Sequence, residues 1–394
     1  MSGSEEHYRT LRDGAVLHVC SDFAQQRIYL SLVSSLERLQ VSQVVYSAVR
    51  SQREAEWRAP ELARIPCHFR KVLAPRHRLL FRSKVQRVTR DLFSRIDLAR
   101  VRLVHAHFLY SDGAVALKLQ ESRGVPYVVA VRNTDLNAFM RYRPDLYRLR
   151  DCVLSRASRV VFLSHAYRRM LLDRLGPAMR ERVARKSVVI PNGVSRAWLE
   201  PPPPRPSDAA GTLRLLYVGD FSRNKNIPHV LEAAALLAAT REVLLTLVGG
   251  GGDGAADVEA QLGSGRFPFA RWLGRVDDPT ALREIYRRHD VFVMPSRLET
   301  FGVVYVEALS QGLPIVHSRG QGVDGYFEPG TVAEAVDPDD PADIAAKVTV
   351  LADRLPAIRE SCEREARRFD WAGIARSYAD LYDSVANEAE AARR

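Results

Sequence analysis

The chain has 394 residues, of which 46% are hydrophobic and 27% charged, and its formal net charge is +11 at pH 7. That length is too great for one small hydrophobic core and predicts two domains. No apolar run approaches the roughly 20 residues of a membrane-spanning helix, the polar N-terminus lacks a signal-peptide pattern, and the four cysteines have no metal-binding spacing. These features argue against an integral membrane protein or a disulfide-rich secreted protein, so we expect a cytoplasmic one.

The N-terminal part of the chain alternates apolar strands with helical segments. Ala15–Cys20 is expected to form the first buried strand, a turn and a helix follow it, and Val41–Val49 supplies the second strand. This β-α-β start is typical of a doubly wound, mostly parallel sheet. Further strands are expected at Val101–His107, Val125–Val131, Arg159–Ser164 and Ser187–Val194.

Positive charge is concentrated in the segment Arg70–Arg102, where eleven lysines and arginines stand against two aspartates. Within it Phe81, Val85, Val88 and Leu92 recur at helical spacing, which predicts a basic amphipathic helix. Such a helix can lie on an anionic membrane surface, contact nucleic acid, or expose its charged face while it packs on its own domain. No nucleic-acid module accompanies it, so we do not expect nucleic acid as a partner.

Two histidines, His105 and His107, stand at alternate positions where the strand Val101–His107 ends. Two histidines on one strand face could bind a metal ion, but no third ligand is spaced for it. Packed or hydrogen-bonded histidines are more frequent than ligands. We therefore predict no metal site here and keep His107 as a candidate on the acceptor side of a site.

A polar turn with Arg132, Asn133 and Asp135 follows the strand Val125–Val131. Arg132 cannot act as a base, because a guanidinium group stays protonated, but it can hold an anionic group. The alternative is an arginine that pairs with Asp135 across the turn. The sequence leaves both interpretations open.

A proline-rich run, PPPPRP, lies within Trp198–Ala210 and is expected to be stiff and extended. It marks the predicted domain boundary. The expected division is a first domain at residues 1–198, a linker at 199–211, a second domain at 212–368, and a terminal helix at 369–394.

The second domain is predicted to open with the strand Leu213–Gly219, followed by a loop with Arg223 and Lys225 and by the helix Ile227–Ala239. The next strand ends in a run of four glycines that starts at Gly249. Glycines at such a place allow close approach of the backbone. A strand and turn then follow at Ala270–Val276.

The most informative stretch is Asp290–Val316, which predicts a strand, a loop, a helix and another strand. Glu299 lies in the loop and Glu307 in the helix, and the amides between them belong to a helix start, where unpaired N–H groups attract phosphate. An anion site with a carboxylate on either side suits a sugar joined to a nucleoside diphosphate. The alternative is an acidic loop before an ordinary amphipathic helix.

The run PSRLETFGVVYVEALSQGLPIV in this stretch resembles the donor-site signature of the retaining, GT-B-fold glycosyltransferases of family four, also called group 1. The resemblance is specific from about Val189 to Tyr382 and looser before that. It implies an α/β fold of two Rossmann-like domains that face a central cleft, with the nucleotide sugar on the second domain and the acceptor on the first. It also implies a C-terminal helix that crosses back to the first domain.

The resemblance assigns roles to several residues. Glu299 would hold hydroxyls of the transferred sugar, Glu307 would hold the ribose, and Lys225 would grip the diphosphate. With Arg132, Glu299 and Lys225 form the expected catalytic set. The expected donor-binding residues are Gly219, Arg223, Lys225, Gly249, Val276, Glu299, Thr300, Phe301, Gly302, Val303 and Glu307, and the expected acceptor-side residues are His107, Arg132, Asn133 and Asp135.

Two positions depart from the family pattern. Asp220 stands where an arginine is usual, and its carboxylate would repel the phosphates unless Arg223 supplies the second positive charge by another loop path. Arg132 stands where the family places a histidine beside the anomeric centre.

The sequence thus predicts a retaining glycosyltransferase that moves a hexosyl or related group from a nucleotide sugar to a saccharide or lipid-linked acceptor in surface polysaccharide or glycoconjugate synthesis. It would act in the cytoplasm or at the inner face of the membrane. No cofactor or metal ion is required by this scheme, because backbone amides and Lys225 would stabilise the departing diphosphate. Three alternatives stay open: a nucleotide-sugar epimerase of the same fold, a non-catalytic nucleotide-sugar-binding relative, and a nucleic-acid-binding protein.

Overall fold

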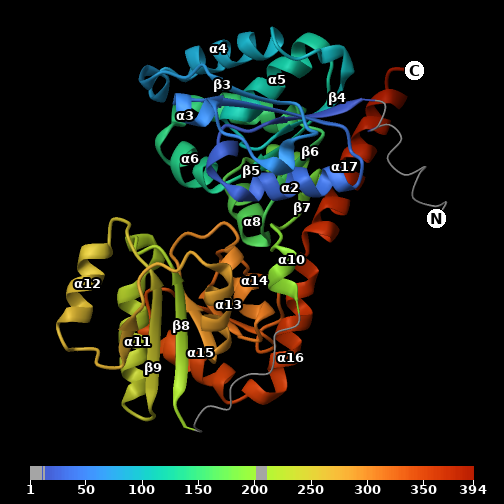
Figure 1. Ribbon diagram of the computed structural model, residues 1–394. Helices are drawn as coiled ribbons and strands as arrows, with labels where there is room; N and C mark the ends of the chain where they lie inside the picture. Colours follow the sequence, from blue (N-terminus) through green and yellow to red (C-terminus); the bar gives the residue numbers. More distant parts are fainter. Residues whose placement is uncertain (1–10, 12–13, 201–210) are drawn as a thin grey trace. The chain divides into compact units, whose positions relative to one another are not determined.

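The computed structural model describes residue 11 and residues 14–200 and 211–394 (Figure 1). Its described residues divide into two compact units. The first takes the chain up to Leu163, Arg168–Pro191 and Trp371–Arg394, and the second takes Ser164–Tyr167 and Asn192–Asp370. The proline-rich run expected to link the domains lies outside the described residues.

The first unit is built on a parallel seven-stranded sheet with the order β3-β2-β1-β4-β5-β6-β7. Nearly continuous apolar strands such as AVLHV and YVVAV suit a sheet that is buried on both faces. The strand order changes direction between β1 and β4, which is where ligands bind in folds of this kind. The strands are β1 (Ala15–Val19), β2 (Gln43–Val49), β3 (Cys67–Lys71), β4 (Val101–Ala106), β5 (Tyr127–Val131), β6 (Arg159–Phe162) and β7 (Ser187–Val189).

The helices of this part of the chain connect the strands as the β-α-β pattern predicts. They are α2 (Arg27–Arg38), α3 (Gln52–Ala55), α4 (Phe81–Phe93), α5 (Ser111–Arg123), α6 (Met140–Tyr142), α7 (Tyr147–Arg156), α8 (His165–Asp173), α9 (Pro177–Arg185) and α10 (Arg196–Leu199). The predicted basic helix is confirmed as α4. The four apolar residues that predicted it, Phe81, Val85, Val88 and Leu92, are all buried, so this face packs on its own domain.

The second unit has a parallel six-stranded sheet with the order β10-β9-β8-β11-β12-β13. The order changes direction between β8 and β11. Its strands are β8 (Leu213–Gly219), β9 (Val243–Gly249), β10 (Ala270–Trp272), β11 (Val291–Met294), β12 (Ile315–Ser318) and β13 (Ala333–Val336), and its helices are α11 (Ile227–Ala238), α12 (Ala255–Gly263), α13 (Pro279–Arg287), α14 (Val303–Ser310), α15 (Pro341–Ala352) and α16 (Leu355–Ala366).

The last helix, α17 (Trp371–Ala391), belongs to the first unit although it follows the second in sequence. Its buried residues Ile374, Tyr378 and Tyr382 share a hydrophobic core with Leu36 of α2 and Leu103 of β4. The first unit is therefore assembled from both ends of the described chain.

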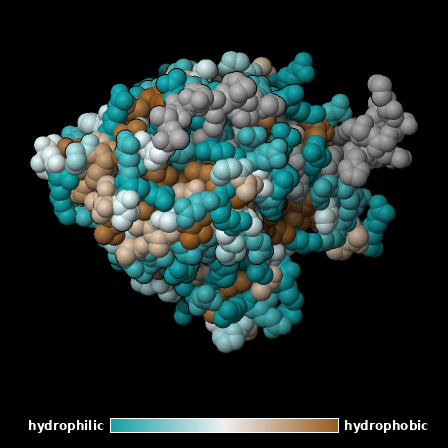
Figure 2. Space-filling view, turned by 90° about the horizontal axis from the view of Figure 1, so that it is seen from below, coloured by the Kyte–Doolittle hydropathy of each residue, from teal (hydrophilic) through white to brown (hydrophobic). Residues whose placement is uncertain are grey.

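No helix in the described part of the chain is long and apolar enough to cross a membrane. The face shown in Figure 2 is covered largely by hydrophilic residues, with hydrophobic residues in patches between them.

Candidate functional site

The predicted strand-loop-helix unit is present, and a glycine shapes its turn. β11 ends at Met294, the loop continues to Gly302, and α14 begins at Val303. Gly302 has a φ of 79°, and a Cβ added there would lie 2.4 Å from the ring of Tyr305 and 3.2 Å from Cγ of Glu299. The Tyr305 hydroxyl donates to the carbonyl of Met294 at 2.6 Å, which fixes the two ends of the loop relative to each other. Only glycine fits this turn without strain.

Lys225 and Glu299, 74 residues apart in sequence, meet in this unit. Nζ of Lys225 lies 2.8 Å from Oε2 of Glu299, and both side chains are mostly buried. Oε1 of the same carboxylate accepts the backbone N–H of Thr300 at 3.1 Å. Without a ligand, the Lys225 ammonium and the Glu299 carboxylate therefore neutralise each other beside the start of α14.

Asn224, which the sequence analysis missed, holds the two loops of this site together. Its Nδ2 donates to the carbonyl of Leu298 at 2.8 Å, and its Oδ1 accepts the N–H of Leu298 at 2.9 Å. Its own carbonyl accepts the N–H of Arg297 at 2.9 Å. Asn226 follows in the left-handed conformation, with a φ of 62°, and donates to the carbonyl of Pro295 at 3.2 Å. Asparagine tolerates that conformation, so two asparagines around Lys225 were a signal for a shaped loop.

The unexpected Asp220 has a structural role in the loop after β8. Its Oδ1 accepts the N–H of Ser222 at 2.9 Å, and its carbonyl accepts the hydroxyl of Tyr217 at 2.6 Å. An aspartate that bonds the backbone two residues on is a turn former. The exposed guanidinium of Arg223 lies 3.7 Å from Asp257 of α12, so its charge has a carboxylate partner on that helix.

The predicted glycines bring strands and loops into close contact. Gly219 and Gly249 face each other at the ends of β8 and β9, and a Cβ on Gly249 would lie 1.8 Å from the carbonyl oxygen of Gly219. The N–H of Gly249 donates to the carbonyl of Gly274 at 2.8 Å, and Val276 lies half-buried in the same loop after β10. Gly219, Gly249 and the turn that leads to Val276 thus form one backbone surface.

Glu307 and Phe301 occupy the buried side of this unit. Burial raises the pKa of the Glu307 carboxyl to about 7, and the hydroxyl of Tyr286 donates to it at 3.4 Å. The Phe301 ring packs on Tyr326 and Phe369, with ring centroids 5.7 Å and 5.6 Å apart. Phe301 therefore contributes its backbone to the helix start, whereas Glu307 carries a largely buried carboxyl group.

On the first unit, Asp135 binds backbone. Its carboxylate accepts the N–H groups of Leu109 at 3.0 Å, Tyr110 at 3.3 Å and Arg132 at 2.9 Å. Burial raises the pKa of the Asp135 carboxyl to about 6 despite these bonds. This residue ties the loop after β4 to the loop after β5. Asn133 lies exposed in the same turn, where its Oδ1 accepts from the side chain of Asn137.

The side chain of Arg132 points into the domain. Its Nε donates to the carbonyl of His107 at 3.3 Å, and its guanidinium carbon lies 5.6 Å from the ring centroid of Tyr29. Asp135 bonds to the Arg132 backbone. The turn is thus closed by the hydrogen bond from the Arg132 N–H to the Asp135 carboxylate, while the Arg132 guanidinium donates to the carbonyl of His107 just beyond β4.

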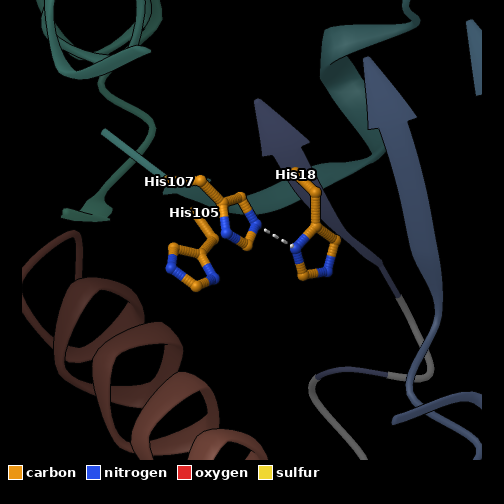
Figure 3. Close-up of side chains that lie close together, drawn as sticks. All are labelled: His18, His105 and His107. Atoms are coloured by element: carbon orange, nitrogen blue, oxygen red, sulfur yellow. Dashed lines mark hydrogen bonds between the residues drawn. The ribbon is translucent and has the colours of Figure 1, made fainter. Parts of the chain in front are cut away.

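The histidines of β4 have a third partner that the sequence analysis missed. His18 of β1 pairs in register with His105, and its ring lies beside that of His107 (Figure 3). Nδ1 of His18 lies 3.1 Å from Nε2 of His107, and Nε2 of His18 lies 3.1 Å from Oε1 of Gln43. The statement that no third ligand is available was therefore wrong, because a neighbouring strand supplies it.

Gln43 fixes the proton positions in this trio. Its Nε2 donates to the carbonyl of Val33, so its Oε1 must accept from Nε2–H of His18. Nδ1 of His18 then accepts from Nε2–H of His107. Burial lowers the pKa of His18 to about 4 and the pKa values of His105 and His107 well below their usual value, so all three rings are neutral.

Within the described residues, this trio is the one group with the geometry to hold a metal ion. It contains no anionic ligand, and the charge of Arg132 already acts on His105 and His107. A divalent cation there would bury two more unpaired positive charges, which is costly. We interpret the trio as a cluster of neutral, packed rings in which His18 is hydrogen-bonded to His107 and His105 stacks on His107 with the ring centroids 3.9 Å apart. Nδ1 of His105 lies 2.6 Å from the hydroxyl of Tyr382, which connects the cluster to α17.

Comparisons with known proteins agree on one family. The model described as glycosyl transferases group 1 matches residues 212–354, and the model described as Glycosyltransferase Family 4 matches residues 25–198. The D-inositol 3-phosphate glycosyltransferase of Thermomonospora curvata is 30% identical over 307 residues, which cover 70% of this chain and 69% of that protein.

Solved structures show the same fold. Sucrose-phosphate synthase from Thermosynechococcus elongatus has a TM-score of 0.70 at 18% identity and covers 94% of this chain and 98% of its own. The Anabaena protein HepE, solved with UDP and glucose, has a TM-score of 0.67 at 18% identity and covers 94% of this chain and 100% of its own. The predicted α/β fold of two Rossmann-like domains is confirmed.

Proposed function

The chain belongs to the group 1 glycosyltransferases, and on that premise we propose that it moves a sugar from a nucleoside-diphosphate sugar to a saccharide or lipid-linked acceptor with retention at the anomeric carbon. The observation that carries the proposal is the Lys225–Glu299 pair at the start of α14. One cation and one carboxylate stand beside helix-start amides, which is the chemistry that a sugar diphosphate needs. The bound UDP and glucose of HepE support the same class of donor.

Donor binding would exchange the partners of this ion pair. The diphosphate takes over Nζ of Lys225 and the amides at the start of α14, and Glu299 is released to accept sugar hydroxyls. The buried carboxylate of Glu307 would accept the hydroxyls of the ribose. The pair in the free protein then keeps both groups in place until the donor arrives, so little reorganisation is needed at binding.

Transfer would follow from stabilising the leaving group. The bond between the anomeric carbon and the diphosphate oxygen breaks, and the electron pair leaves with the diphosphate, whose growing charge is stabilised by Lys225 and the amides. The acceptor oxygen bonds to the anomeric carbon on the same face, and its proton passes to the leaving phosphate oxygen. In this proposal neither a cofactor nor a metal ion takes part.

On the acceptor side, we propose that Arg132 favours an acceptor with an anionic group. Its charge is fixed at the ends of β4 and β5 by the bond to His107 and by the ring of Tyr29. The name of the Thermomonospora relative specifies a phosphorylated inositol. The wider proposal is a step of surface polysaccharide or glycoconjugate synthesis at the cytoplasmic face of a membrane, to which the basic segment Arg70–Arg102 would attract the protein.

The test is a thermal-shift panel of UDP, GDP, dTDP and ADP sugars on the wild type and on Lys225→Ala and Glu307→Ala. Lys347→Ala is the matched control, because it removes another lysine–carboxylate pair, to Glu334 at 2.9 Å, in the same unit. We expect one nucleotide to stabilise the wild type and the control but neither site variant. If every donor leaves the wild type unchanged, the proposal fails, whereas a donor that binds but is transferred to no acceptor would indicate a non-catalytic relative.

Two further measurements separate the alternatives. Incubation with the binding donor and no acceptor should leave the sugar unchanged, and its epimerisation would instead indicate an epimerase. The anomeric configuration of the transfer product, read by NMR coupling constants, must match that of the donor. Inversion would overturn the retaining mechanism.

A further inference from the structure

Two segments of the first unit expose large apolar side chains to solvent. Leu79 and Leu80, between the short helix η3 (Pro75–Arg78) and α4, are 82% and 54% exposed, and Tyr142 at the end of α6 is 67% exposed. Scattered exposed leucines are ordinary on a protein surface. These side chains are different because neighbouring contacts bring their two segments together.

Phe81 connects the two segments. It follows Leu80 directly, is itself buried, and meets the ring of Phe139 edge-on with the centroids 5.8 Å apart. The guanidinium carbon of Arg143, next to Tyr142, lies 6.0 Å from the centroid of the Phe81 ring. Leu79, Leu80 and Tyr142 are therefore exposed on two segments that these contacts hold together, and we call the three side chains the apolar tip.

Arginines surround the apolar tip. Residues 75–82 and 139–147 contain five arginines and a single acidic residue, Asp145, whose carboxylate is bound by Arg143 at 2.8 Å and 2.7 Å. The guanidinium carbon of Arg141 lies 5.3 Å from the ring centroid of Tyr142. The arginines of this set are Arg76, Arg78, Arg82, Arg141 and Arg143.

The basic helix α4 cannot itself insert into lipid, because Phe81, Val85, Val88 and Leu92 are buried in its own domain. An apolar contact with a bilayer must therefore come from residues beside the helix. Leucines flanked by arginines, with a tyrosine at the same surface, have the composition of an interfacial membrane anchor: apolar side chains enter the lipid boundary, and the cations bind headgroup phosphates.

We propose that the apolar tip inserts into the interfacial region of an anionic lipid bilayer, with the surrounding arginines on the headgroups. This inference rests on the proposed function and extends it, because it names the surface by which the first unit would bind a membrane. The charge of the surroundings selects an anionic bilayer, and the two leucines distinguish insertion from purely electrostatic adsorption.

The test is co-sedimentation of the full chain with phosphatidylcholine vesicles, with and without phosphatidylglycerol. The variants are Leu79→Ser/Leu80→Ser/Tyr142→Ser and Arg78→Gln/Arg82→Gln. Leu236→Ser is the matched control, since Leu236 is a leucine on α11 of the second unit and is 51% exposed. Unchanged melting temperatures will show that the exposed substitutions leave the fold intact.

We expect the wild type and the control to bind only the anionic vesicles and the triple variant to lose about tenfold in partition. The arginine variant should bind more weakly than the wild type at low salt and should lose less binding than the wild type as salt rises. Binding by the triple variant equal to that of the wild type would overturn insertion and indicate adsorption by charge alone. Absence of vesicle binding by the wild type at low salt would also overturn insertion. If, in addition, the wild type and the triple variant both bind DNA, the basic surface would be assigned to nucleic acid.

Transfer to a water-soluble acceptor, measured in parallel, separates this inference from the proposed function. Transfer without vesicle binding overturns the apolar tip and leaves the transferase standing. Vesicle binding that requires the leucines, in a protein that transfers no sugar, supports the apolar tip and counts against the transferase.

Discussion

The predicted residues of the second unit and those of the first use their polar groups differently. Around α14, Lys225 and Glu299 are paired side chain to side chain, so a ligand can take each of them over. Beyond β4 and β5, Asp135 bonds to three backbone N–H groups and Arg132 to a backbone carbonyl. The same kinds of residue are therefore paired with each other on one side and, in the case of Asp135, bonded to backbone on the other. A charged residue in a family motif need not contact substrate.

The comparison predicts its largest effect at Lys225. Lys225→Ala should lower kcat/KM by about 100-fold to 1,000-fold, because a charge on the leaving group loses its partner in the transition state. Steady-state kinetics with the donor identified by thermal shift will measure it. The control Lys347→Ala should stay within about twofold of the wild type, and an equal loss in both variants would contradict a specific role.

Asp135 should act on stability instead. Asp135→Ala leaves three backbone N–H groups without their acceptor and should lower the free energy of unfolding by about 2–4 kcal/mol. Urea unfolding will measure this, and nucleotide binding by the folded fraction should be unchanged. Asp145→Ala, at an exposed ion pair, is the control. If Asp135→Ala lost acceptor affinity but kept the stability of the wild type, Asp135 would be an acceptor-binding residue and the contrast between the two units would be wrong.

The histidine trio makes the first unit sensitive to acid. The folded pKa of His18 is about 4 against the usual 6.5, so between these pH values the unfolded chain binds a proton that the folded chain does not. The contribution of the neutral His18 ring to the free energy of unfolding is therefore fully present above pH 6.5 and is lost as the pH falls towards 4. His18→Asn should be less stable than the wild type at pH 7, and the difference should shrink by about 2 kcal/mol by pH 5.

Urea unfolding at both pH values tests this, with the wild type as reference. The buried carboxyls of Asp112, Asp135 and Glu307 have raised pKa values and act with the opposite sign. They are present in both proteins, so the difference between the two isolates the imidazole. A constant difference from pH 7 to 5 would mean that His18 is already protonated in the fold.

The smallest effect is expected at Glu307, whose pKa of about 7 puts its ionisation near neutrality. The ionised carboxylate accepts ribose hydroxyls better than the protonated acid. Donor affinity should therefore rise by about threefold to tenfold between pH 6 and 8, as measured by calorimetry. Glu307→Gln should bind more weakly and without this pH dependence, and a Glu307→Gln profile parallel to that of the wild type would assign the titration to another group.

Sequence reasoning succeeded where the information is local. The strand, loop and helix around Glu299 and Glu307 follow from a contiguous pattern, and α4 follows from its spaced apolar residues. The contact between Lys225 and Glu299 depends on β8 and β11 lying side by side, which no spacing in the sequence could supply, although the family resemblance gave both residues a role at the donor. His18 was missed because its partners stand on a neighbouring strand, and Asn224 because its bonds cross between two loops.

The helix α4 also shows that a local sequence pattern does not determine tertiary contacts. Its period correctly predicts a helix with one apolar face. Whether that face meets lipid or protein depends on what the rest of the domain places against it. The exposed Leu79 and Leu80 belong to no period at all, so only the three-dimensional arrangement distinguishes them from a solvated turn.

The position of α17 has a consequence for how the protein is made. On the ribosome, the seven strands of the first unit emerge before any part of the second sheet, yet Tyr378 and Tyr382, which cover His105 and the adjoining core, are translated only after the second unit. The nascent first unit must wait, with an apolar face of its sheet open, while the whole second unit is synthesised. Protection of that face by a chaperone, or rapid folding of the second unit, would decide the yield of intact enzyme.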